Sequence, residues 1–555
     1  MLNKKFLWAL GFTFSVAGLS SAYAQQGEIE SQTYEIVKEK SIEFPKANRQ
    51  VFKLQPVQEA NEQQKLRYTF RDPELKLLVP KITPAAVAST DEQERQDKPE
   101  GLDNYVKLGG GNYGRFLGDA FISGRSGEDL VVSAKLKHLS SATGPVRGKE
   151  SANSATGIGL NAKYLGAASK VDGGITFDRD RYYFYGHRMP ENVTEIDRDS
   201  LKQTLSRFGI HLGLENTQPG TLIDYSFKTA LNTVKDRYAA SEVDWGTNLR
   251  TSLPLGDNYF ALFDADMYIS QRVDALTYNR NLFRVKPAFK YASDLFAVSL
   301  GLNAVSETDN GLDVNRTRAY PDLKVDIKPV EGLHIFAGWN GDIIRNTLNG
   351  LLQENQWLGA NAMVANTEKT TDIFGGVKGE TMAGINYEAK VSYANYKNFY
   401  VFNNMLEDTS KFAVLYDGTK TKVLTISGHL GYEMDDLFKS SLKVNYFNYS
   451  MGRLEEAWHR PDLTVNWFNA LTLSKKLFFT TDLYVMKGIK GKNFQTSEVV
   501  NLPAIADLNI KIDYLLTRNF GAFVGLNNIF GKNYQRNLYY SQQGLNFVGG
   551  LSISF

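Results

Sequence analysis

The sequence predicts an all-β fold, a transmembrane antiparallel β-barrel of about 22 strands, on three observations. The last nine residues, Phe547 to Phe555, alternate apolar with small or polar side chains and end on Phe. The same period of two residues recurs along the chain from about residue 103. No segment after the N-terminus has the roughly 20 consecutive apolar residues that a spanning helix needs. Because lipid offers no partners for backbone amides, a membrane protein without such helices must be a closed barrel. A large soluble β protein is the alternative.

The final strand illustrates the pattern. Its apolar face is formed by Phe547, Leu551, Ile553 and Phe555. The small and polar residues between them point to the other face, which suits lipid outside and water inside. A terminal Phe, here Phe555, resembles the closing-strand signal of bacterial outer-membrane barrels. We therefore expect the barrel-assembly machinery and outer-membrane lipid as partners.

The first 24 residues are predicted to be a secretory signal peptide. Lys4 and Lys5 form its basic start, and an apolar run follows from Phe6 to Leu19. Ala22 and Ala24 occupy the small-x-small positions of a cleavage site, so the mature chain is expected to start after Ala24. A membrane anchor is disfavoured because the apolar run is too short. The chain has no cysteine, which excludes disulfides and a cysteine-linked lipid.

Residues 25–102 are predicted to form a largely irregular periplasmic segment. They are rich in Gln, Glu and Lys, and six prolines interrupt any long element. The apolar piece from Leu75 to Ile82 could lie extended against another surface.

Residues 103–555 are predicted to form the barrel, with short turns at one end and long loops at the other. The expected turns lie at 124–127, 166–169, 218–220, 256–258, 293–294, 331–332, 381–383, 435–436, 474–476 and 517–519. Ten turns make ten hairpins, and the first and last strands bring the total to about 22. Long polar loops are expected at 140–155, 189–200, 342–367 and 488–498. This asymmetry is typical of outer-membrane barrels.

Three segments resemble the barrel of TonB-dependent receptors. They are the glycine-rich hairpin from Tyr105 to Phe116, the segment from Gly525 to Tyr534, and the closing strand to Phe555. In style the chain is also similar to large barrels of the Bacteroidota. The resemblance implies a Gram-negative outer-membrane barrel that moves a solute. The family carries a plug domain before the barrel, and residues 25–102 are too short for one. Glu35-Ile36-Val37 is a poor match to a TonB box, so coupling to TonB is left open.

Charged residues on the polar faces of the expected strands are the candidate lumen-facing set. They carry both signs, which suggests a wall of ion pairs around water or a polypeptide. The set is Lys135, Lys137, Asp264, Asp266, Lys324, Asp326, Glu388, Lys390, Lys443, Lys511 and Asp513.

Catalytic and metal-binding signatures are weak, and we expect no enzyme activity, cofactor or metal. The six histidines have no metal-site spacing. His138 beside Ser140 is the only hint of a hydrolase pair, and Asp309 to Asn315 lacks the final acidic ligand of a calcium loop. Gly109 to Gly111 precedes no helix that could bind phosphate. The net charge of +2 implies no attraction to nucleic acid.

Aromatic residues cluster near the expected strand ends. The groups are 182–185, 396–402, 446–449 and 539–540. We expect them chiefly to form the girdle at the membrane interface, with packing against a sugar or partner as the alternative.

Two functions follow from these observations. The leading hypothesis is passage of a solute across the outer membrane, as the resemblance implies. The alternative is a plug-less barrel that serves as a non-catalytic partner in an outer-membrane complex, with a separate plug or a surface lipoprotein bound to it. A barrel of this size encloses a wide lumen, which must be filled or serve as a pore.

Overall fold

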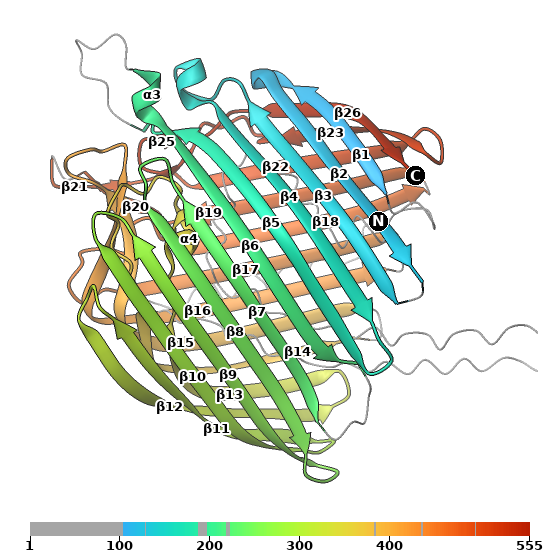
Figure 1. Cartoon of the computed structure of the whole chain (residues 1–555), viewed down its shortest axis with the longest axis vertical. Coiled ribbons are helices and arrows are strands. Elements are labelled where there is room, and N and C mark those ends of the chain that lie inside the picture. Colours follow the sequence, from blue (N-terminus) through green and yellow to red (C-terminus); the bar gives the residue numbers. More distant parts are fainter. Residues whose placement is uncertain are drawn as a thin grey trace, which may run out of the picture.

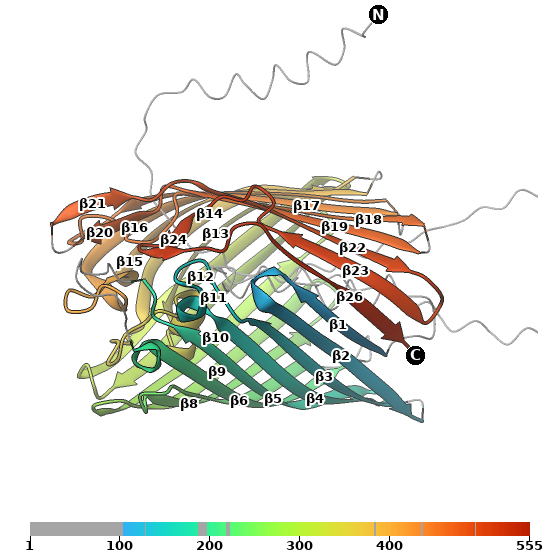
Figure 2. The same cartoon turned by 90° about the horizontal axis from the view of Figure 1, so that it is seen from above.

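The chain folds into one closed ring of strands (Figures 1 and 2). The computed structural model describes residues 104–555 apart from 128, 187–196, 218–222, 382–383, 435–436, 475 and 494–495. Within these residues, 22 strands form one antiparallel sheet, in which β1 pairs with both β2 and the last strand, β26. The predicted all-β fold and the strand number are therefore confirmed.

The strands of the ring follow one another in sequence order. They are β1 (Tyr105–Gly111), β2 (Arg115–Ser126), β3 (Leu130–Ser141), β4 (Asn153–Leu165), β5 (Ser169–Tyr183), β6 (Lys202–Asn216), β7 (Asp224–Lys235), β8 (Ser241–Pro254), β9 (Tyr259–Val273), β10 (Thr277–Ala292), β11 (Phe296–Asp309), β12 (Val314–Val330), β13 (Leu333–Ile344), β14 (Thr367–Glu380), β15 (Ile385–Asn404), β16 (Phe412–Met434), β17 (Phe438–Ser450), β18 (Leu463–Ser474), β19 (Leu477–Lys487), β22 (Ile505–Leu515), β23 (Phe520–Asn527) and β26 (Asn546–Ser554).

Several short elements lie in the connections. They are the 3-10 helices η1 (Asn112–Gly114) and η2 (Gly148–Ser151), the helices α3 (Arg198–Leu201) and α4 (Leu348–Glu354), and the strand pairs β20 (Lys490–Asn493) with β21 (Glu498–Asn501) and β24 (Gln535–Asn537) with β25 (Tyr540–Ser541). In the described part of the chain, no helix is long and apolar enough to cross a membrane.

The two ends of the barrel differ as expected. Tyr105 pairs with Ser554, so β1 begins and β26 ends at the same end, which we call the turn end. The predicted turns at 218–220 and 435–436 lie outside the described residues, and the other eight lie where two successive strands meet at this end. The long connections, such as residues 345–366 between β13 and β14, lie at the opposite end, which we call the loop end. Short turns beside the termini and long loops opposite are the outer-membrane arrangement.

The outer face of the ring is apolar. Phe547, Leu551, Ile553 and Phe555 are all exposed, as the final strand predicts, and Leu551 has 64 % of its surface free. Exposed Phe and Ile on β9 alternate with the buried Asp266. Large apolar side chains on the outside and charges on the inside are what a ring in lipid requires. The hollow is therefore polar.

The first and last strands meet along a seam of glycines. A Cβ on Gly111 would lie 1.8 Å from the carbonyl oxygen of Phe547, and one on Gly550 would lie 2.0 Å from that of Leu108. Only glycine lets the two backbones approach this closely. The glycine-rich start of the barrel therefore serves closure of the ring.

Candidate functional site

The predicted lumen-facing residues all lie on strands of the ring, namely β3, β9, β12, β15, β17 and β22. Their sequence neighbours Leu136, Val325 and Tyr514 are exposed on the outer face. Because successive side chains of a strand point to opposite faces, the charged residues lie on the inner face. Phe555 follows β26 at the turn end, and its amide donates to the Asn104 carbonyl. Ala22 and Ala24 lie outside the described residues.

The strongest charge network of the lumen wall is centred on Asp266. This carboxylate is 2.6 Å from Arg250 and 2.9 Å from Arg284, and Arg284 is 2.9 Å from Asp342. Asp264 joins it at 3.4 Å from Arg250. Cations and carboxylates alternate across neighbouring strands, so the network carries little net charge.

Other members of the predicted set pair locally. Asp513 is 3.2 Å from Lys511, and Asp326 is 2.6 Å from His334 and 3.1 Å from Lys378. Lys324 is 3.3 Å from Asp322.

The remaining members differ in their surroundings. Lys390 is buried with its ammonium 4.2 Å from the Phe374 ring centroid, whereas Lys443 is exposed to the lumen. Lys135, Lys137 and Glu388 are half-buried.

Sequence reasoning missed a second buried network near the loop end. Arg316 contacts Glu307 at 2.8 Å and Glu368 at 3.0 Å, and Arg280 contacts Asp309 at 2.8 Å. The period-two alternation of β10, β11 and β12 carries the signal for these residues, because each lies on the polar face of its strand.

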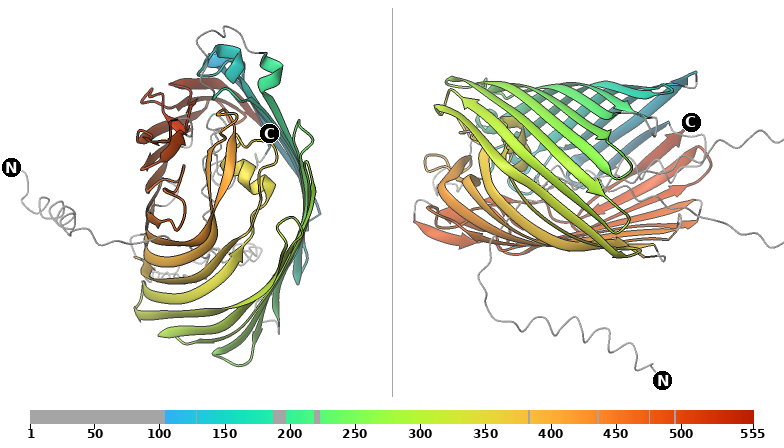
Figure 3. Two further views of the ribbon diagram at one scale, coloured as in Figure 1. Left: turned by 90° about the vertical axis from the view of Figure 1, so that its left-hand side faces the viewer. Right: turned by 90° about the horizontal axis from the view of Figure 1, so that it is seen from below.

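The connection between β13 and β14 folds into the barrel mouth. Viewed from the loop end, its helix α4, in yellow, lies inside the ring (Figure 3, left). Thr347 caps α4 by accepting from the Gly350 amide at 2.9 Å. Glu242 of β8, which is buried, accepts from the Leu348 amide at 2.9 Å and the Asn349 amide at 3.3 Å. A carboxylate at the start of a helix satisfies amides that have no helical partner. The wall of the barrel therefore holds this loop in place.

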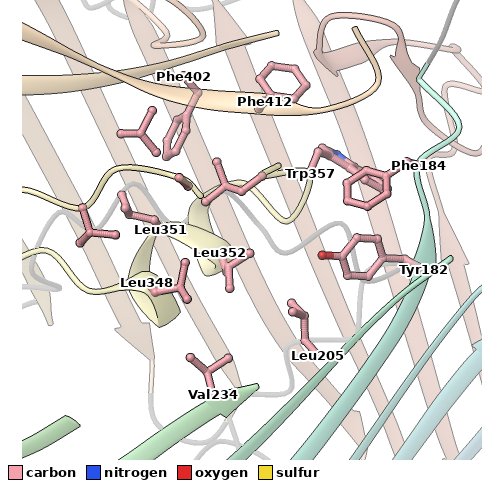
Figure 4. Close-up of a cluster of buried hydrophobic side chains, with 14 of the residues drawn as sticks. Tyr182, Phe184, Leu205, Val234, Leu348, Leu351, Leu352, Trp357, Phe402 and Phe412 are labelled. Carbon is pink, nitrogen blue, oxygen red and sulfur yellow. The ribbon is translucent and has the colours of Figure 1, made fainter. Parts of the chain in front are cut away.

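A hydrophobic cluster, which we call the loop core, joins this loop to both walls of the ring (Figure 4). Trp357 stacks on Tyr540 with ring centroids 3.9 Å apart, and it meets Tyr182 and Tyr185 edge-on. The loop core comprises Tyr182, Phe184, Tyr185, Leu205, Val234, Leu348, Leu351, Leu352, Trp357, Leu358, Ala362, Val364, Phe402, Phe412, Val414 and Tyr540. It therefore lies across the loop end of the lumen.

Hydrogen bonds tie the loop core together. The hydroxyl of Tyr182 donates to the Gln356 carbonyl, and that of Tyr540 donates to the Ser410 carbonyl. Tyr185 donates to the Ser541 carbonyl at 3.0 Å. Burial raises the pKa of Tyr185 and of Tyr540 above its usual value. The phenols therefore stay neutral donors.

His459, in the connection between β17 and β18, links β15 to the connection between β24 and β25 beside the loop core. Its Nδ1 lies 2.8 Å from the Phe402 carbonyl, and its Nε2 lies 3.1 Å from the Leu538 amide nitrogen. A carbonyl can only accept and an amide N–H can only donate, so the ring is neutral with its proton on Nδ1. Burial lowers the pKa of His459 to about 3, with a further effect of Arg536. Phe412 packs edge-on against the ring.

Two cavities flank α4. One, of about 40 Å³, lies between α4 and strands β4 to β6, and its lining includes Asn153, Asp180, Arg207, Gln353 and Asn355. The other, of about 200 Å³, lies toward β7 and β8 and is mainly polar, and Gln353 lines both. Asn355 is buried, and among the described residues its Nδ2 has no hydrogen-bond partner.

The predicted aromatic girdle is wrong for most of the aromatic clusters. Tyr182 and Phe184 belong to the loop core, and Tyr183 is buried too. Tyr396 and Phe399 form a second buried cluster with Trp458, whereas Tyr446 is exposed on the outer face. The period of two alone does not show that loops fold inward to cover side chains at the strand ends. These aromatic residues pack instead against other side chains of the chain.

The weak chemical candidates have structural roles. His138 Nδ1 lies 2.7 Å from Thr156 Oγ1, on the outer face where the Phe116 ring also packs. Asp309 pairs with Arg280 and accepts from the amides of the following turn. Among the described residues, no group of acidic and histidine side chains could hold a metal ion.

Similar proteins are found by comparing structures and not by comparing sequences. No family model matches the sequence, and no curated protein matches it either. The FrpB iron transporter of Neisseria meningitidis matches with a TM-score of 0.64 and 10 % identity, over 83 % of each chain. The chain has the fold of outer-membrane receptor barrels. The ferripyoverdine receptor of the Pseudomonas aeruginosa outer membrane matches with a TM-score of 0.60 and 11 % identity, over 82 % of this chain and 72 % of its own.

A third receptor barrel agrees with these two. The siderophore receptor PirA of Acinetobacter baumannii matches with a TM-score of 0.60 and 10 % identity, over 81 % of this chain and 80 % of its own. The predicted resemblance to TonB-dependent receptor barrels is thus confirmed at the level of the fold. At such low identity, the likeness carries no ligand from those receptors to this one.

Proposed function

We propose that this receptor-type barrel resides in the outer membrane, crosses it with its strands and moves a solute through its lumen. The observation that carries the proposal is the loop core, because an open pore would have no packed cluster across one mouth. A packed cluster that links an infolded loop to both walls suits a gate. Transport then requires that the gate rearrange when the solute binds.

The cavity toward β7 and β8 supports a small polar solute. Charged and amide side chains line it, among them Asp244, Arg345 and Asn349. The matched structures are named as an iron transporter, a ferripyoverdine receptor and a siderophore receptor, and at 10–11 % identity these ligands do not carry over to this chain.

Conductance in planar bilayers tests the gate. Trp357→Ala should weaken the loop core by about 3–5 kcal/mol and raise the conductance of the purified barrel well above that of the natural protein. The matched control is Trp467→Ala, because Trp467 is exposed on the outer face. Equal conductance in the two variants, or a natural protein that is already as open as Trp357→Ala, would contradict the proposal.

A second candidate is the non-catalytic partner in an outer-membrane complex. The loop core favours it, because a packed cluster at the loop end can serve as a platform for another protein. The test is native purification followed by mass spectrometry. A stoichiometric surface lipoprotein or plug protein, together with no solute-dependent conductance, would favour the partner over the transporter.

A further inference from the structure

A set of unpaired cations lies on the outer face of the barrel, just beyond its apolar surface on strands β3 to β7. Leu136, Ile158, Phe177 and Phe208 lie opposite one another across β3, β4, β5 and β6 and are all exposed. Arg179 lies two positions nearer the loop end than Phe177 on the same face of β5, and Lys235 lies at the matching height on β7. Arg181 lies two positions further along β5. We call Arg179, Arg181 and Lys235 the outer cation patch.

The register of strands β5, β6 and β7 sets the spacing of the patch. Arg179 and Lys235 both lie opposite Ser206, so they are separated by one strand. Neighbouring strands are about 4.8 Å apart and residues two apart on a strand about 7 Å. Along the surface the three positions are therefore about 7 to 12 Å apart. They form a compact positive group rather than scattered charges.

These cations differ from those of the lumen. In the described part of the chain, none of the three makes an ion pair or a side-chain hydrogen bond, and all three are exposed. The acidic side chains of α3 are already engaged. Asp197 accepts from the Asp199 amide, and Asp199 is 3.8 Å from Lys202. Among the described residues, the like charges of the patch therefore have no anionic partner.

Hydroxyl side chains flank both arginines. Arg179 lies between Thr156 and Ser206, and Arg181 lies between Ser154 and Thr204, on the adjoining strands. A guanidinium with hydroxyls beside it suits the oxygens of a phosphate group, which accept several hydrogen bonds.

At the same height along the barrel axis, the outer face of β9 carries no charge. Beyond the exposed Ile269 of β9 lies Gln271, which donates to Asn279 of β10 at 3.0 Å. A general feature of the loop end would place cations there too. The outer face of β9 therefore lacks the cations that β5 and β7 carry, whereas β16 carries Lys420 and Lys422 on its outer face toward the loop end.

We propose that the outer cation patch binds the phosphate groups of lipid headgroups in the leaflet at the loop end. The patch continues directly from the lipid-covered apolar surface, so a headgroup is the anion that reaches it. Clustered Lys and Arg at the edge of a membrane surface attract anionic headgroups. This site is independent of the solute that passes through the lumen.

Lipid retention by the purified barrel tests the proposal. The full chain in neutral detergent is titrated with lipid A that carries its phosphates and with dephosphorylated lipid A, and bound lipid is measured by native mass spectrometry. The natural protein should bind the phosphorylated form more tightly. The triple variant R179Q/R181Q/K235Q should lose affinity for it by on the order of a hundredfold at low salt.

Two controls make the result specific. R179K/R181K/K235R keeps the charge and should retain most of the binding, and R125Q/K328Q/K476Q removes three cations at the turn end and should bind normally. Heat-shifted electrophoretic mobility confirms that each variant is folded. Equal binding of the two lipids, or equal loss in the patch and turn-end variants, overturns the proposal.

The natural protein alone provides a second readout. Its binding of phosphorylated lipid should weaken steeply as salt is added, because exposed charges are screened. Binding that is independent of salt overturns the proposal even if the triple variant does not fold. Capture of an acidic protein in place of lipid would also overturn it.

Discussion

At the scale of single residues, His459 stabilises the loop end only as a neutral ring. Its folded pKa is about 3, below the ordinary value of 6.5. Between these values the unfolded chain binds a proton that the folded chain does not, so stability falls as the pH drops through this window. The contribution is fully present above about pH 6.5. We expect proteolysis of the loops to accelerate as the pH is lowered from 6.5 toward 3.

His459→Gln tests the origin of this dependence. A glutamine does not titrate, so the variant should lose much of the acceleration between pH 6.5 and 3, even if its loops are somewhat weaker throughout. An unchanged pH profile would assign the effect to other groups.

Residue-scale roles were partly predictable. The alternation of Asp264, Asp266, Lys511 and Asp513 with apolar residues was sufficient to place them on one face of their strands. The partners of Asp266 were not predictable, because Arg250 and Arg284 approach it from neighbouring strands whose register no single sequence specifies. His459 gave no signal, since its three contacts come from residues distant in the chain.

At the scale of elements, α4 depends on a carboxylate from another strand. Glu242→Ala would leave two amides of α4 without acceptors at a cost of about 2 kcal/mol. We expect faster protease cleavage within residues 345–366 and an intact ring. Glu388→Ala is the control, because Glu388 is a half-buried lumen carboxylate that caps no helix. Equal cleavage in both variants would contradict the role of Glu242.

The seam between β1 and β26 makes a second prediction at this scale. Gly550→Val would force a side chain into the Leu108 carbonyl, so we expect the ring to close poorly and the heat-shifted electrophoretic form to be lost. Gly428→Val on β16 is the control, since a Cβ there meets no atom within 4 Å. If the heat-shifted form of Gly550→Val were as abundant as that of the control, the seam would tolerate a valine side chain.

Strand and turn positions were the most predictable elements. Each predicted turn carries residues suited to tight hairpins, and the eight that the described residues cover lie where successive strands of the ring meet. Helix α4 was not predicted, because a helix of seven residues within a polar loop has too little periodicity to be distinguished, and its stability comes from packing.

At the scale of the whole molecule, the lumen wall carries charges of both signs in close pairs. A passage lined in this way attracts neither cations nor anions over the other. In the opened Trp357→Ala barrel, we therefore expect a reversal potential close to zero across a salt gradient. A strongly cation- or anion-selective current would contradict the inference that the charges of the lumen wall are paired. The whole ring was predictable because period two, turn chemistry and the absence of spanning helices all point to it, whereas closure of one mouth depends on contacts between distant loops.

The contact between Tyr185 and Ser541 joins residues 356 apart in the chain. Residues so far apart can meet only after the intervening strands have paired, since non-local contacts wait for the structure that brings them together. We therefore expect the Tyr185–Ser541 contact, and the loop core around it, to form only after the ring has closed.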